Sequence, residues 1–255
     1  MTQSGWKRKF IAIAAGQAVS LIGSAAVQFS LIWWIASETN SPIMLGLSGL
    51  AAYLPALFLS PLAGVLADRL NRKMICILSD MFVGLSALVF ALFMWKSEVA
   101  SGMALVVLFV RGISGTFQQP AIQAIIPQLV PPQELVKANG WTQFMQSGAF
   151  MIGPVLGAAM YAALPMPVIL LTDLAGAIVA SVMLGMVPIP KLTVVAPKKQ
   201  QFLREWRDGL QIYLEDRTLM NIMVVQALCM LFYLPLSAFY PLMTSSYFKA
   251  IACYL

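Results

Sequence analysis

Three ionisable side chains stand inside long apolar stretches of this sequence, and these are the residues that could do chemistry: Asp80, Arg111 and Asp173. A charge within an apolar stretch of membrane length is costly, so residues of this kind are commonly functional. The chain contains no histidine, which removes the usual carrier of protons near neutral pH. Any proton exchange within these stretches must therefore use carboxylates.

Arg111 and Asp173 are predicted to lie at similar depth. Arg111 follows Gly102, the outer end of its stretch, by nine residues, and Asp173 follows Met166 by seven. At roughly 1.5 Å per residue their depths differ by about 3 Å, which favours an ion pair. Two interpretations stay open: Asp173 takes part in coupling, its contact competing with protonation or substrate, or the pair is a static structural salt bridge.

Asp80 follows Lys73 by seven residues, which places it about 10 Å from the inner surface, and we expect it to pair with the cations that precede it. Glutamines within the apolar stretches extend the polar set, and each could face an aqueous cavity or bridge two helices: Gln17, Gln28, Gln143 and Gln146.

Nothing in the residue pattern predicts an enzyme. The sequence has no H-E-x-x-H motif and no nucleophile with a convincing base. Its three cysteines, Cys76, Cys229 and Cys253, lack the spacing of a metal site or redox motif. We therefore predict no metal, no cofactor and no disulfide framework.

The elements that must position these residues are membrane helices. Of the 255 residues 60% are hydrophobic and 10% are charged, and the mean hydropathy is +0.83, far outside the range of soluble proteins. Runs of about 20 apolar residues suit bilayer-spanning helices. Seven such runs are present, near 10–36, 42–65, 74–95, 102–121, 140–163, 166–187 and 218–240.

The lysines and arginines predict the orientation of these spans. If the N-terminus is cytoplasmic, thirteen of them fall on the inner side and only Lys96 and Lys249 on the outer side, as the positive-inside rule requires. The sequence thus predicts a multi-pass protein of the plasma membrane with a cytoplasmic N-terminus. Because topology explains the net charge of +6, no nucleic-acid partner is predicted.

Between the second and third runs lies a charged stretch, residues 64–73, which we interpret as a short cytoplasmic loop. Asp68 and Arg72 are four apart, so one helical turn would place them side by side. Gly64 would let a neighbouring helix approach closely. The spacing favours a docking hinge over a simple connector.

Two features complete the organisation. On the fifth run, Gly153, Pro154 and Gly157 combine close helix packing with the loss of a backbone donor, which favours a functional kink. The chain then divides into a six-helix membrane half over 1–187, a cytoplasmic linker with an amphipathic helix over 188–217, and the first span of a second half over 218–255.

These motifs resemble the major facilitator superfamily. The stretch Gly64-Val-Leu66-Ala-Asp68-Arg69-Leu-Asn71-Arg72-Lys73 resembles the family's signature loop, Arg111-Gly-Ile-Ser-Gly115 its arginine motif on helix four, and Gly153-Pro154-x-x-Gly157 its antiporter motif on helix five. The resemblance implies a helical bundle of two six-helix halves, in which Asp68 and Arg72 latch the first half to the second. Asn71 stands at the family's loop glycine, an exchange we attribute to asparagine's tolerance of the left-handed conformation.

More closely, the chain resembles the macrolide-efflux branch of the drug:proton antiporters, through Gly16-Gln-Ala-Val-Ser20, Ile189-Pro-Lys-Leu192 and Ala238-Phe-Tyr-Pro-Leu242. The resemblance implies export of macrolides or similar lipophilic compounds against protons, with the bilayer and a small-molecule substrate as partners. Because family members have about twice the six spans of one half, we expect an apparently truncated form whose partner is the missing second half or another exporter subunit. The alternatives are export of other amphipathic substrates, such as lysophospholipids, and a non-transporting membrane scaffold.

Overall fold

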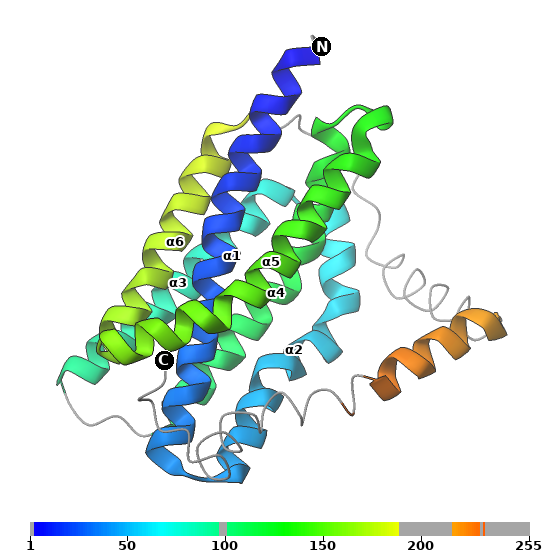
Figure 1. The fold of residues 1–255 in the computed structure, drawn as a ribbon. Coiled ribbons are helices and arrows are strands. Elements are labelled where there is room, and N and C mark those ends of the chain that lie inside the picture. Colours follow the sequence, from blue (N-terminus) through cyan, green and yellow to red (C-terminus); the bar gives the residue numbers. More distant parts are fainter. Residues whose placement is uncertain (1–2, 97–100, 189–215, 230–231, 233–255) are drawn as a thin grey trace.

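The fold is seen in a computed structural model (Figure 1), which describes residues 3–96, 101–188, 216–229 and 232. Its elements are helices α1 (Gln3–Thr39), α2 (Pro42–Arg69), α3 (Arg72–Lys96) and α4 (Ser101–Leu129), the short 3-10 helix η1 (Pro132–Glu134), and helices α5 (Leu135–Ala163) and α6 (Met166–Met186). A further helix covers Arg217–Cys229. All regular structure in the described residues is helical, which confirms the predicted class.

Short polar junctions reverse the chain between long helices. After α1, Asn40 adopts φ 46° and its amide donates to the Ala36 carbonyl at 3.0 Å, a left-handed helix end for which asparagine is suited. Ser41 then accepts a hydrogen bond from the Met44 amide, and Pro42 begins α2, both favoured choices at a helix start. Two residues are therefore enough to turn the chain around.

The six helices α1 to α6 run alternately up and down (Figure 1). We call the end where α1, α3 and α5 begin and α2, α4 and α6 end the cation-rich end. Helix α1 packs along α5 and α6, α4 packs along α2 and α3, and α3 packs along α6. Exchanging α1–α3 with α4–α6 leaves this set of neighbours unchanged, as expected for two inverted three-helix repeats.

Small residues set the closest helix approaches. A Cβ added to Gly157 of α5 would lie 2.5 Å from the Ala26 carbonyl oxygen of α1, and one on Gly153 would overlap Ala25. Gly112 of α4 meets Ala52 of α2 in the same manner. Gly153 and Gly157 thus let α1 and α5 pack closely, whereas Gly148 has no described atom within 4 Å of an added Cβ. Pro154 lies within the continuous helix α5, and the functional kink stays a prediction.

Two apolar clusters fill the interior, one toward each end of the bundle. One includes Val27, Phe90 and Leu108, and the other, at the cation-rich end, includes Ile13, Ile125 and Leu184. Between them in sequence on four of the helices lie most of the buried polar residues, which form what we call the polar layer: Gln17 and Ser20 of α1, Ser79 and Asp80 of α3, Arg111 and Ser114 of α4, and Asp173 of α6.

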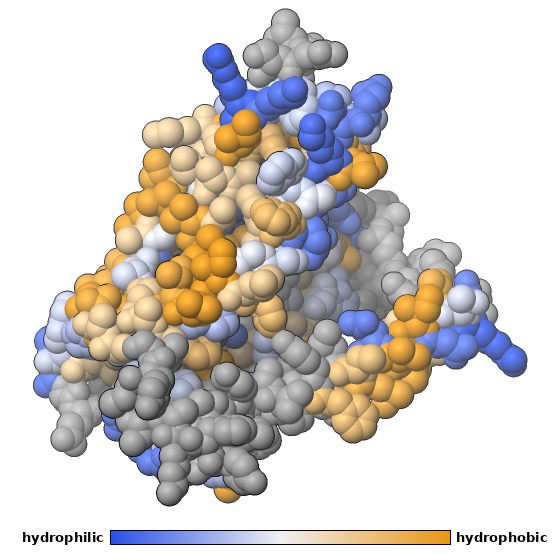
Figure 2. Space-filling view, viewed as in Figure 1, coloured by the Kyte–Doolittle hydropathy of each residue, from blue (hydrophilic) through white to orange (hydrophobic). Residues whose placement is uncertain are grey.

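The outer surface of the bundle is apolar. Many large side chains, such as Ile43, Leu57 and Phe58 of α2, are exposed, and Figure 2 shows apolar residues along the flank and hydrophilic residues gathered at the cation-rich end. Such a surface suits lipid contact. By length and composition α1, α2, α3 and α6 can each cross a membrane, while α4 and α5, with 29 residues each, pack beside them.

Several sequence predictions extend beyond the described residues. The amphipathic helix expected after the linker and the second part of the seventh run lie outside them, as do Cys253 and Lys249. The helix Arg217–Cys229 covers the first part of that run. The count of seven spans and the division at 187 and 217 therefore stay predictions.

One boundary was predicted wrongly. The stretch 64–73 is not itself a loop, because α2 continues through Arg69 and α3 begins at Arg72, so only Leu70 and Asn71 connect them. Charged residues are solvated as readily at a helix end as in a loop, since the end reaches past the apolar interior. Asp68 and Arg72 consequently face each other across the junction of two helices.

Candidate functional site

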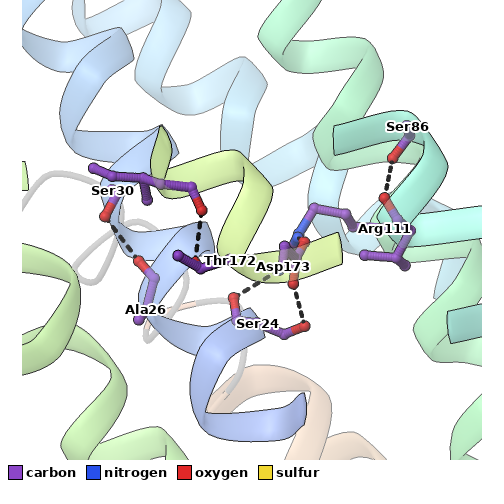
Figure 3. A network of polar contacts seen from close by, with 9 residues as sticks. Ser24, Ala26, Ser30, Ser86, Arg111, Thr172 and Asp173 are labelled. Carbon is purple, nitrogen blue, oxygen red and sulfur yellow. Dashed lines mark hydrogen bonds and ion pairs between the residues drawn. The ribbon is translucent and has the colours of Figure 1, made fainter. Parts of the chain in front are cut away.

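An ion pair lies at the centre of the polar layer (Figure 3). The Arg111 guanidinium binds the Asp173 carboxylate, and their side chains are only 7% and 2% exposed. Ser24 of α1 donates to Asp173 Oδ1 at 2.8 Å, and Arg111 Nη2 donates to the Ser24 carbonyl at 2.6 Å. The predicted contact between Arg111 and Asp173 is therefore present, and it joins α1, α4 and α6.

Asp80 was expected to pair with the cations before it, and this expectation is wrong. Its Oδ1 instead accepts a hydrogen bond of 2.7 Å from Gln118 Nε2 of α4. Arg72 is directed to Asp68 and to the Ala67 and Ala124 carbonyls, and Lys73 is directed to the end of α6. The helix turns Asp80 inward, away from the cations at its own start.

Several polar atoms of this layer have no hydrogen-bond partner among the described residues. They are Oδ2 of Asp80, both side-chain polar atoms of Gln17, Nε of Arg111 and the hydroxyl of Ser114. Buried polar groups are normally satisfied, so unpartnered ones mark a place for water, an ion or a ligand. Gln17 and Ser20 also face the Asp80 carboxylate from α1.

A pocket opens beside the polar layer, between α1, α4 and α5. Its lining is mainly apolar, with four amides and one hydroxyl among the side chains. Two of the four predicted cavity glutamines, Gln17 and Gln146, line it, whereas Gln28 and Gln143 are not among its lining residues. The pocket residues are Phe10, Ile13, Ala14, Gln17, Leu21, Gln118, Gln119, Ile122, Ile125, Ile126, Leu129, Thr142, Met145, Gln146 and Leu184.

Sequence reasoning did not single out Gln118 as a pocket residue. Its pair with Gln119 precedes Pro120 near the end of an apparent run, where polar residues are ordinary. The structure shows that α4 continues to Leu129 with Pro120 and Pro127 inside it, so the glutamine pair lies within the helix. The sequence signal that could have indicated this pocket residue is the presence of two adjacent amides inside a membrane helix.

The junction of α2 and α3 forms a second polar cluster at the cation-rich end. Arg72 donates to the Ala124 carbonyl of α4 at 2.9 Å, and Lys73 donates to the Val187 carbonyl at the end of α6 at 2.9 Å. A cation beside the last carbonyls of a helix is stabilising. Asp68 lies 3.4 Å from Arg72 and its side chain is 76% exposed.

The Asn71 backbone is not in the left-handed conformation, because Asn40 is the only non-glycine residue with positive φ among the described residues. Its side-chain oxygen instead accepts hydrogen bonds from the amides of Lys73 at 3.1 Å and Met74 at 3.4 Å. It therefore caps the start of α3. Asparagine suits this position through its short side chain rather than through an unusual backbone.

Comparisons with known proteins identify the family. The profile of the Major Facilitator Superfamily matches residues 13–252. Macrolide efflux protein A of Streptococcus pyogenes is 35% identical over 247 residues, which cover 96% of this chain and 61% of that protein. Macrolide efflux protein A of Enterococcus faecalis is 33% identical over 211 residues, covering 82% of this chain and 65% of that protein.

A more distant relative, the uncharacterised MFS-type transporter YkuC of Bacillus subtilis, is 28% identical over 186 residues, covering 72% of this chain and 42% of that protein. The chain thus spans less than two thirds of the length of these relatives. Family match, helical architecture and apolar surface agree on a multi-pass membrane protein of a transporter family and not an enzyme. The chain belongs to the major facilitator superfamily.

Proposed function

We propose that this chain forms the N-terminal part of a secondary transporter that exports macrolide-type or other lipophilic drugs by proton antiport. The observation that carries the proposal is the similarity to macrolide efflux protein A over 96% of the chain. The pocket agrees with it only in the chemistry of its lining, apolar with a few amides and a hydroxyl, because its cavity of about 40 Å³ is too small to hold a whole drug molecule in this conformation.

The junction of α2 and α3 is proposed to latch this half to a second half. Gly64 has none of the described residues within 4 Å of an added Cβ, so the surface beside it is open to a further helix. The exposed Asp68 stands on the same helix, while Arg72 is fixed to α4. A latch of this kind requires an accessible charged side chain, here Asp68, on helices that are held in place.

We place the cation-rich end on the cytoplasmic side of the cell membrane. Of the lysines and arginines in α1 to α6, Arg111 lies within the bundle and Lys96 at the opposite end, while the cation-rich end holds Lys7, Arg8, Lys9, Arg69, Arg72, Lys73 and Lys137. This asymmetry supports a cytoplasmic N-terminus. A reporter that is active only outside the cytoplasm should stay inactive when fused to residue 1, and activity there would reverse the orientation.

The transport proposal is tested with two proteins: the 255-residue chain, and a chimera in which this chain continues into the part of the Streptococcus pyogenes protein that follows the aligned region. Both are expressed in macrolide-sensitive bacteria at membrane levels matched by immunoblot. We expect the chimera to lower macrolide accumulation and a protonophore to restore it. The complete Streptococcus pyogenes protein is the positive control.

A chimera that reaches the membrane but leaves macrolide accumulation unchanged, while the control lowers it, would contradict the proposed substrate. Lower accumulation that a protonophore does not reverse would contradict proton antiport. Transport of lysophospholipids in place of macrolides would favour the amphipathic-substrate alternative. Co-purification with an exporter subunit, without transport by either protein, would favour the scaffold.

A further inference from the structure

Two buried carboxylates lie in the polar layer, and they differ in their partners. We propose that Asp80 is the carboxylate that binds and releases the proton, and that Asp173 is the fixed counter-ion of Arg111. The proton-binding part of this inference stands on the geometry of the described residues alone. Its transport part rests on the proton antiport proposed above.

No cation lies beside Asp80 in the described part of the chain. Asp80 is only 4% exposed, its Oδ1 accepts from the Gln118 amide, and its Oδ2 has no partner. An ionised carboxylate that is buried without a counter-ion carries a large desolvation cost. A proton on Oδ2 supplies the missing positive charge and makes that oxygen a donor.

The groups that face Asp80 come from three neighbouring helices and from α3 itself. Helix α6 contributes Asp173, α4 contributes Gln118, and α1 contributes Gln17 and Ser20. On α3 itself, Cys76 lies one turn before Asp80 and is buried. The charged side chain among these neighbours is therefore a second carboxylate and not a cation.

Arg111 does not offset this imbalance, because both of its terminal nitrogens are engaged. Nη1 binds Asp173 and Nη2 donates to the Ser24 carbonyl. The polar layer therefore holds two carboxylates and one guanidinium, and one bound proton makes it neutral. Asp173 already has the Arg111 guanidinium and the Ser24 hydroxyl as partners, so Asp80 is the group left to take the proton.

Two glutamines connect Asp80 to the pocket. Gln118, which binds Asp80, and Gln17, which faces it, both line the pocket, and the Gln17 amide has no hydrogen-bond partner among the described residues. In the release step the O–H bond of the Asp80 carboxyl breaks, its electron pair stays on the carboxylate, and the proton passes to a water molecule in the pocket. Uptake is the reverse of this step.

Infrared spectroscopy of the purified 255-residue chain in liposomes tests proton binding without transport. We expect a carbonyl band of a protonated carboxyl group that disappears as the pH rises. Because all ten Asp and Glu residues contribute at acidic pH, Asp80 is identified by difference from the unmodified chain: Asp80→Asn should lose one component of the band, and Asp80→Glu should restore a component at a shifted frequency. Asp68→Asn, which changes an exposed carboxylate, should keep the component of Asp80. Circular dichroism checks that each variant keeps its helical content.

A band with every component unchanged in Asp80→Asn, or a spectrum without any such band between acidic and alkaline pH, would overturn the assignment. So would a component that is lost in Asp173→Asn and kept in Asp80→Asn. These outcomes do not depend on drug export, so they separate failure of this inference from failure of the proposed function.

The chimera tests the transport part. With Asp80→Asn, we expect loss of drug accumulation driven by a pH gradient in vesicles, with drug exchange retained when no gradient is applied. Gradient-driven accumulation equal to that of the unmodified chimera would refute the coupling role. If the chimera moves no drug, whether residue 80 is aspartate or asparagine, the proposed function is contradicted. The infrared result then decides whether Asp80 binds the proton.

Discussion

Removing the charge of Asp173 should destabilise the bundle far more than removing the charge of Asp80. Asp173→Asn leaves the Arg111 guanidinium buried, with the Ser24 carbonyl as its remaining partner among those described. Breaking one side of a buried ion pair costs about 3–5 kcal/mol. At about 2–4 °C per kcal/mol for chains of this size, the unfolding midpoint should fall by roughly 6–20 °C.

The double variant Arg111→Gln with Asp173→Asn removes both charges and should recover part of this loss, because no unpaired charge then remains. Asp80→Asn is the matched control: it makes the same chemical change in the same polar layer, but Asp80 has Gln118 rather than a cation as its partner. We expect its stability to equal or exceed that of the unmodified chain.

The assay is thermal unfolding of the purified chain in detergent, followed by circular dichroism, with unfolding in increasing SDS as a second measure. An unfolding midpoint of Asp173→Asn equal to that of the unmodified chain would refute the role of the ion pair in stability. So would a loss of stability in Asp80→Asn as large as that in Asp173→Asn, because the counter-ion would then make no difference.

Three further changes test the packing and the junction. Gly157→Leu should separate α1 from α5 and lower the unfolding midpoint strongly, because its Cβ would meet the Ala26 carbonyl, whereas Gly148→Leu, with no described atom within 4 Å, should leave it nearly unchanged. Asn71→Ala should cost about 0.5–2 kcal/mol through loss of the α3 cap, measured in the same melts, and Asn71→Asp should retain the cap. Asp68→Asn should lower drug export by the chimera while leaving the stability of the 255-residue chain unaltered, and equal export would remove the latch from the account.

The helices could be predicted from sequence because each is specified by a local property, a long apolar run, and the prediction succeeded for α1 to α6 even though the ends were displaced. Polar and charged residues at the ends, such as Lys7 and Arg69, still belong to helices, since a helix does not stop where the apolar interior stops. The Arg111–Asp173 pair was also predictable. It needs only similar depth on two helices, and depth follows from counting residues along each.

The direction in which a side chain points from the helix axis does not follow from counting residues. Asp80 is an example. Its depth of about two turns from Lys73 allowed a contact with the cations at the start of α3, yet those cations bind carbonyls at the ends of neighbouring helices. The packing of α3 against both α4 and α6 turns Asp80 toward Gln118 instead. Which neighbour faces a buried carboxylate is a property of three helices together, and it is this property that leaves Asp173 with a cation and Asp80 without one.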